Sequence, residues 1–171
     1  NVFFADPTFV LQFVNHLPFL PTLKKLRLLP VPASRLPRHA ITFPTLGHLQ
    51  LISSQLPNLE QLDIKLDCSS FPLFLGPNTQ LTPASHPLTQ LFIVPSSPLL
   101  ETCTHAQFVS LSFYLDNLFP FVDDMVSRFD QDAGDHYMDE RTRSMHSFWS
   151  AMGGLLKGYQ GLRQVAASSN S

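Results

Sequence analysis

The sequence predicts an α/β fold: an irregular leucine-rich-repeat solenoid fragment with short parallel strands, helices or loops on the back, and a C-terminal capping helix. Three observations predict it. A nine-residue pattern recurs along the chain, this pattern contains the spacing L-x-x-L-x-L, and alternating apolar segments are separated by segments with helical periodicity. The 171 residues can bury a substantial core. We assign residues 1–165 to one domain and residues 166–171 to a disordered tail. The missing initiator Met indicates a fragment of a longer chain.

The first element is predicted to be a helix, because Asp6 suits the N-cap and Pro7 suits the first helical position. Apolar residues between positions 9 and 17 then form one stripe. The next element is a strand, in which leucines alternate with Lys25 and Arg27. The alternation is clearest over residues 62–66, which we also predict to be a strand.

The repeated pattern is [Leu/Phe]-Pro-[Thr/Asn]-Leu-x-x-Leu-x-[Leu/Ile], at residues 20–28, 43–51 and 56–64, with a weaker copy from His86. The copies' first leucines are Leu23, Leu46, Leu59 and Leu88, so the intervals are 46−23=23, 59−46=13 and 88−59=29 residues. Leucine-rich repeats have a period of about 20–29 residues, and the interval of 13 is too short. Either a segment has been lost or the second copy is a helix on the back. We favour the helix, because a strand–helix–strand crossover then fits between the flanking strands.

The remaining elements follow the same reasoning. Residues 88–94 alternate as a strand, and residues 103–119 have helical periodicity that ends before Pro120. Residues 121–129 form a further candidate strand, followed by a polar, acidic loop. The last helix has one apolar face that includes Trp149. We expect its segment 144–160 to cap the solenoid, because an open solenoid end must be covered to stay soluble.

Composition excludes several classes of function. The charged fraction is 14% and the formal charge is −2, so nothing predicts binding to nucleic acid or to an anionic membrane. No apolar run reaches the roughly 18 residues that a membrane span needs. Cys68 and Cys103 lie far apart without metal-type spacing, so we expect free thiols in a reducing, cytoplasmic or nuclear compartment.

Catalytic signatures are also missing from the sequence. It contains no nucleophile elbow, phosphate loop, H-E-x-x-H or paired C-x-x-C motif. His136 and His146 lie near several acidic residues, but their spacing matches no common metal-ligand set, and we interpret the segment as a solvated loop. We therefore expect no enzyme, no cofactor and no metal.

The alternation within the predicted strands instead indicates a binding surface. If the leucines face the core, the residues between them line the concave face, which solenoids use to bind partners. The candidate partner-binding residues are Lys25, Arg27, Gln61, Asp63, Gln90 and Phe92.

An ordered set of short motifs adds a resemblance. The motifs are His86-Pro87-Leu88, Ser97-Pro98, Leu118-Phe119-Pro120 and the helix with Trp149. With these motifs the chain resembles the C-terminal leucine-rich-repeat region of basidiomycete fungal F-box-like proteins. The resemblance implies the substrate-recognition region of a ubiquitin ligase subunit, with a protein substrate that it does not identify. It implies an adaptor partner only through an F-box, which is absent from these residues.

Two other functions stay open on sequence alone. One is a fragment of an α/β enzyme, such as a hydrolase, which would need polar residues at the carboxyl ends of its strands. The other is a decayed, partly deleted repeat protein without function, which the short interval of 13 residues favours.

Overall fold

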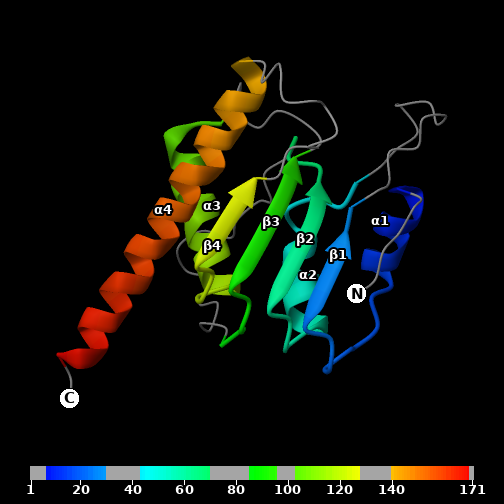
Figure 1. Cartoon of the computed structure of the whole chain (residues 1–171), viewed down its shortest axis with the longest axis horizontal. Coiled ribbons are helices and arrows are strands. Elements are labelled where there is room, and N and C mark those ends of the chain that lie inside the picture. The colour runs from blue at the N-terminus through cyan, green and yellow to red at the C-terminus, as the bar shows by residue number, and fades with distance from the viewer. Residues whose placement is uncertain (1–6, 30–42, 70–84, 96–102, 128–139, 170–171) are drawn as a thin grey trace.

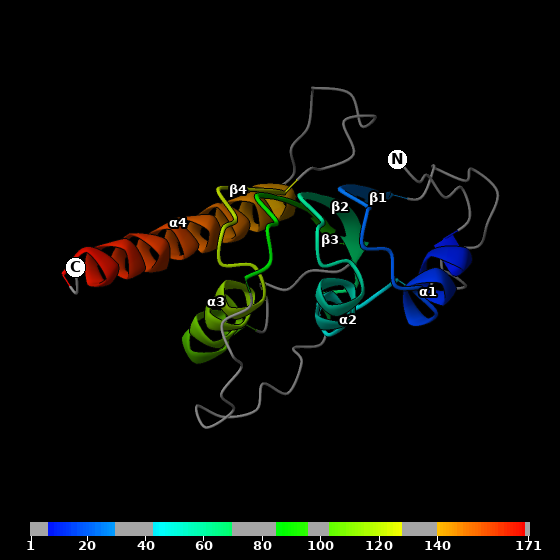
Figure 2. The same cartoon turned by 90° about the horizontal axis from the view of Figure 1, so that it is seen from below.

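The fold is mixed α/β, with a four-stranded parallel sheet whose strand order follows the chain order, β1-β2-β3-β4. The computed structural model describes residues 7–29, 43–69, 85–95, 103–127 and 140–169. Helices α1, α2 and α3 lie on one side of the sheet, and α4 runs past its β4 end (Figures 1 and 2). The elements are α1 (Pro7–Asn15), β1 (Lys25–Leu28), α2 (His48–Gln55), β2 (Gln61–Leu66), β3 (Gln90–Pro95), α3 (His105–Leu118), β4 (Asp124–Ser127) and α4 (Glu140–Ser168).

Equivalent apolar residues of successive strands lie side by side in the core. Leu26 pairs with Leu62, Leu62 with Leu91, and Leu91 with Met125. A second row, one pleat further along, joins Leu28, Ile64 and Ile93. These side chains belong to one buried cluster that also takes residues from all four helices. The prediction that leucines of successive copies share one interior between parallel strands is therefore confirmed for the copies at residues 20–28, 56–64 and 86–93.

The proline in the repeated pattern belongs to a turn that precedes three of the strands. The N–H of Leu23 donates to the carbonyl of Leu20 at 3.2 Å, and that of Leu59 donates to Leu56 at 3.1 Å. Val122 and Phe119 form the same bond at 3.3 Å. In each turn proline is the second residue, where its fixed φ angle favours the turn. The nine-residue pattern thus corresponds to one turn followed by one strand.

Each turn also joins the next one in the same way. The carbonyl of Lys24 accepts from the N–H groups of Glu60 and Gln61, at 2.7 and 3.0 Å. The carbonyl of Glu60 accepts from the two residues that enter β3, and the carbonyl of Thr89 from the two that enter β4, all at 2.9–3.1 Å. The strand entrances are therefore aligned by a repeated pair of backbone hydrogen bonds.

The second copy of the pattern is not a strand but leads into α2, as favoured from the sequence. Thr45 forms a bridge with Asp67 beside the end of β2, and the chain then turns into the helix. Leu46, Leu49 and Ile52 are fully buried on the side that faces the core. The interval of 13 residues thus joins a helix to a strand, so it does not require a deletion.

A fourth unit was not recognised as a copy of the pattern. Phe119, Pro120, Val122 and Met125 occupy the positions that Leu56, Pro57, Leu59 and Leu62 occupy two units earlier. The strands begin at residues 25, 61, 90 and 124, so the structural intervals are 36, 29 and 34 residues. The strand predicted within residues 121–129 is confirmed as β4.

Helix α4 is longer than predicted. It begins at Glu140, inside the segment expected to be a polar loop, and continues to Ser168, three residues into the expected disordered tail. Ala166 and Ala167 are strong helix formers, which accounts for the extension at this end. The predicted apolar face is confirmed, because Trp149 is fully buried together with other residues of the same face, Phe148, Met152 and Leu156.

Polar contacts fix α4 against α3 and the entrance of β4. The hydroxyl groups of Ser112 and Tyr159 are 3.1 Å apart, and the guanidinium of Arg163 forms an ion pair with Asp116. Arg163 also donates to the carbonyl of Pro120 at 2.9 Å, in the turn before β4. Helix α4 therefore lies against the last strand of the sheet, the place expected for a capping helix.

Candidate functional site

All six predicted partner-binding residues lie on the sheet face that points away from the core. Lys25, Gln61 and Gln90 are register partners in one row, and Arg27, Asp63 and Phe92 form the next row. Both rows alternate along their strands with the buried leucines, so the sequence pattern correctly placed these residues on a common face. We call this surface the open face.

The six residues differ strongly in exposure. Lys25, Arg27 and Gln90 are exposed, and Gln61 is half-buried. Asp63 is only 2% exposed and Phe92 only 6%. Periodicity indicates the face on which a side chain lies, but it gives no information about how much of that face is covered. Direct contact with a partner is therefore available mainly to the row that contains Lys25 and Gln90.

Asp63 is held in a polar network within the chain. One of its carboxylate oxygens accepts a hydrogen bond from the side-chain amide of Gln61 at 3.1 Å. The other lies 3.6 Å from Nε of Arg27, in an ion pair that crosses from β2 to β1. A second cross-strand pair joins Lys24 to Glu60 at 2.6 Å, where both side chains are exposed. These two ion pairs join neighbouring segments of the chain and stabilise the register of β1 and β2.

Asp124 is the open-face residue that the sequence analysis missed. It is the register partner of Gln90, so it extends the row from Lys25 to the fourth strand, and its side chain is exposed. Asp123, just before it, is also exposed. The spacing Pro-x-Val-x-x-Met from Pro120 to Met125 was the available signal, because it repeats the proline-to-leucine spacing of the earlier copies.

His86 is buried between two elements and serves the fold. Its Nδ1 accepts a hydrogen bond from the N–H of Leu88 at 3.2 Å, so Nε2 carries the proton and donates to the carbonyl of Leu56 at 2.9 Å. Its ring packs edge-on against Phe119. Burial lowers its pKa, although the bond to Leu56 opposes this shift. His86 is therefore neutral, and its hydrogen bonds join the end of α2 to the entrance of β3.

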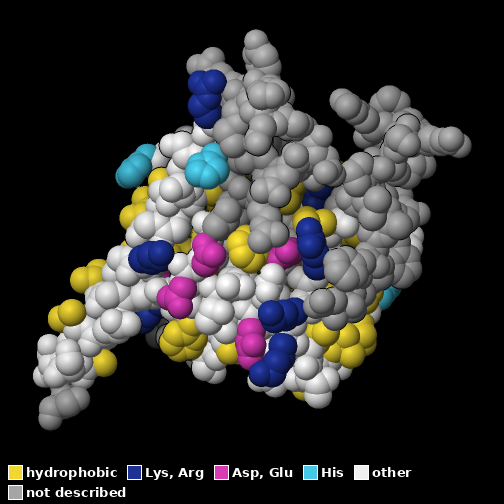
Figure 3. Space-filling model, viewed as in Figure 1, with side chains coloured by type: hydrophobic (Ala, Val, Ile, Leu, Met, Phe, Trp, Pro, Cys, Tyr) yellow, Lys and Arg dark blue, Asp and Glu magenta, His cyan; other side chains and the backbone are white. Residues whose placement is uncertain are grey.

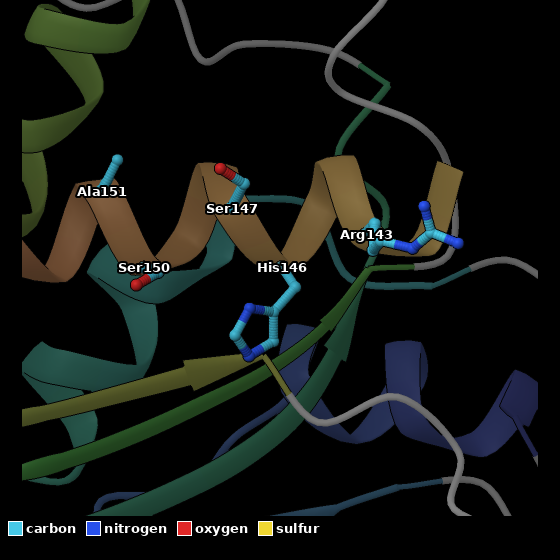
Figure 4. Close-up of a pocket in the computed structure, with 5 residues that line it drawn as sticks. All are labelled: Arg143, His146, Ser147, Ser150 and Ala151. Carbon is cyan, nitrogen blue, oxygen red and sulfur yellow. The ribbon is translucent and has the colours of Figure 1, made fainter. Parts of the chain in front are cut away.

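A shallow hollow of about 540 Å³ lies along the N-terminal half of α4. Its described lining residues all come from this one helix: Arg143, His146, Ser147, Ser150 and Ala151. Figure 4 shows that they leave the helix in different directions, with His146 and Ser150 on one side and Ser147 and Ala151 on the other. These described groups do not converge on a common point.

The two cysteines are free thiols, with Cys68 buried and Cys103 half-buried. Burial raises the pKa of both, so neither is a thiolate near neutral pH. Within the described part of the chain, no three His, Cys, Asp or Glu side chains lie close enough together to hold a metal ion. Most of the acidic segment around His136 lies outside the described residues.

None of the helices described here has both the length and the apolar character that crossing a membrane requires. A comparison of the chain with protein-family models, with curated proteins and with solved structures finds no match.

Proposed function

We propose that this chain is a non-enzymatic protein–protein interaction module whose open face binds a segment of a partner protein. The observation that carries the proposal is the strand alternation. Leucines of successive strands face one core, which leaves the intervening polar side chains of all four strands in register on the opposite face. A row of this kind, on a rigid parallel sheet, presents side chains at regular intervals to another macromolecule.

The architecture that we propose is an irregular leucine-rich-repeat solenoid with α4 as its cap. The repeated turns, the shared leucine rows and the placement of α1, α2 and α3 on one side of the sheet support it (Figure 2). Two of the three intervals, 36 and 34 residues, exceed the roughly 20–29 of regular repeats, and the third, 29 residues, lies at the upper limit of that range. Helices on the back of the sheet account for the longer intervals, since a helical crossover needs more residues than an extended one.

We further propose that the intact protein is an F-box-type ubiquitin ligase subunit and that this chain recognises its substrate. This part depends on the family resemblance. Several residues of the resemblance lie in the described part of the fold: His86 joins α2 to β3, Phe119 and Pro120 belong to the turn before β4, and Trp149 is buried on α4. Ser97 and Pro98 lie outside the described residues. An F-box outside this chain would bind the ligase adaptor.

Affinity capture with the full-length gene product tests both parts. Recovery of the ligase adaptor is expected, and its repeated absence would remove the ubiquitin part. The double variant Lys25→Glu with Gln90→Glu should lose the substrate protein while keeping the adaptor. The matched control is Gln50→Glu, which changes an exposed residue of α2 and should keep both. Equal capture of the substrate by the double variant and the control would contradict binding at the open face.

The strand order bears on the enzyme alternative. Open α/β sheets bind their ligands where the strand order reverses, and the order of the four described strands runs without reversal. The alternative of a decayed, partly deleted repeat protein loses its main support, because α2 accounts for the short interval. No observation favours either alternative over the interaction module.

A further inference from the structure

The row at the strand entrances has opposite charges at its two ends. It runs from Lys25 on β1 through Gln61 and Gln90 to Asp124 on β4. Lys25 and Asp124 are exposed, and neither forms an ion pair with another residue that the structure describes. Two polar amides separate them. We call these four residues the entrance row.

A neighbouring charge strengthens this polarity at the β4 end. At the β1 end, Lys24 and Arg27 each form an ion pair with a carboxylate, that of Glu60 and that of Asp63. At the β4 end, exposed Asp123 adds a second carboxylate beside Asp124. Figure 3 shows basic side chains over the β1 side of this face with acidic side chains among them, and further acidic side chains toward β4, beside a basic side chain near α4.

The geometry of the row sets the spacing that a ligand must have. Adjacent strands lie about 4.8 Å apart, so the three steps from β1 to β4 span about 14 Å. An extended peptide rises about 3.3 Å per residue, and side chains four residues apart lie on the same side of it, about 13 Å from one another. The residue midway between them faces the same way and would meet the two amides.

We propose that the open face recognises an extended, mixed-charge segment of its protein partner, which crosses the four strands at the entrance row. An acidic side chain of the segment binds at Lys25, a basic side chain four residues away binds at Asp124, and a polar side chain between them contacts Gln61 and Gln90. This inference rests on the proposed function, since it names the chemistry of the partner at the same face.

The experiment uses three synthetic peptides with the sequences Glu-Thr-Gln-Thr-Lys, Glu-Thr-Gln-Thr-Glu and Lys-Thr-Gln-Thr-Lys, blocked at both ends. Threonine favours the extended form. Binding is followed by NMR from the backbone amide shifts of the entrance row at low ionic strength. The affinities will be weak, because each exposed ion pair contributes only about 0.2–1 kcal/mol. The mixed-charge peptide should bind to the natural chain about threefold to tenfold more tightly than either of the others.

Charge reversal at either end should change the preference. Lys25→Glu makes both ends acidic, so the peptide with two lysines should bind best, and Asp124→Lys should favour the peptide with two glutamates. The double variant should again prefer the mixed-charge peptide, bound in the opposite direction. Recovery in the double variant would also show that the single variants are folded.

Equal binding of all three peptides to the natural chain, or shifts confined to other surfaces, would overturn the charge pattern. An unchanged preference in both single variants would do the same. Either result leaves the proposed function standing as long as the open-face double variant still loses the substrate in the capture experiment. The two failures are therefore distinguishable.

Discussion

Four glycines in α4 can be used to test how closely this helix packs against the sheet. A methyl group placed on Gly153 would lie 3.3 Å from Cβ of Met125 and 3.6 Å from its carbonyl oxygen, in β4. At Gly154, Gly158 and Gly161 the same methyl group would have no atom within 4 Å, apart from the helix's own backbone and chain neighbours. One position in the helix is therefore close to the sheet, and the other three serve as internal controls.

The expected magnitudes follow from these distances. Replacing glycine by alanine inside a helix is favourable by about 0.8–1.0 kcal/mol, so Gly154→Ala should raise the free energy of unfolding by about that amount. Gly153→Ala has the same intrinsic gain, but its methyl group is closer to Met125 than the roughly 3.5–4.0 Å optimum between carbon atoms. Overpacking of a core typically costs about 1–3 kcal/mol. We expect this variant to be unchanged or destabilised by up to about 2 kcal/mol.

Urea denaturation and thermal unfolding of both variants measure the difference. For a chain of this size, about 1 kcal/mol corresponds to about 2–4 °C in Tm, so the increase in Gly154→Ala is within reach of calorimetry. Gly158→Ala should behave like Gly154→Ala. If Gly153→Ala proved as stabilising as Gly154→Ala, α4 would not be seated against Met125, and the proposed cap would have to be abandoned.

Three further predictions follow. Leu62→Ala should lower the free energy of unfolding by about 2–5 kcal/mol, because this fully buried side chain lies between two core leucines, whereas Gln61→Ala on the open face should change it by less than about 1 kcal/mol in a urea titration. Because burial lowers the pKa of His86 below the ordinary 6.5, the unfolded chain binds the proton more readily, so stability should fall as the pH drops below about 6.5; His86→Asn should reduce this difference between urea midpoints at about pH 7.5 and about pH 5.5. Burial raises the pKa of Tyr114 to about 12 from an ordinary 10.0. The stability that its neutral phenol contributes to the folded chain should therefore be lost as the pH rises from about 10 to about 12. Tyr114→Phe should remove this phenol from an absorbance titration and lower stability by about 0.5–1.5 kcal/mol at neutral pH, since its hydroxyl donates to the carbonyl of Leu46.

Most of the secondary structure could be predicted from short-range patterns. The alternation of leucines with polar residues predicted β1, β2 and β3, and the helical period predicted α1, α3 and the apolar face of α4. Prediction was harder where one local pattern suits two structures. The copy at residues 43–51 has the same spacing as a strand copy, yet after one bridge between Thr45 and Asp67 it leads into α2, while β2 pairs with β1 on one side and with β3 on the other.

The candidate site, too, could be predicted only in part from the sequence. Periodicity placed six side chains on one face correctly, since side chains on a strand alternate strictly between its two sides. It could not show that Asp63 and Phe92 are buried there, or that Asp124 completes the row, because exposure and register depend on neighbouring strands that are distant in sequence.

The repeating unit of this protein can be read from local sequence: a proline turn, a strand with an apolar side and a polar side, and helices with one apolar face. These are local properties, set by backbone restriction at proline and by the periods of strand and helix. The order of the units in the sheet, the exposure of each polar side chain and the position of α4 cannot be read in this way. Those outcomes depend on hydrogen bonds and packing between residues that are about 30 or more positions apart in the chain.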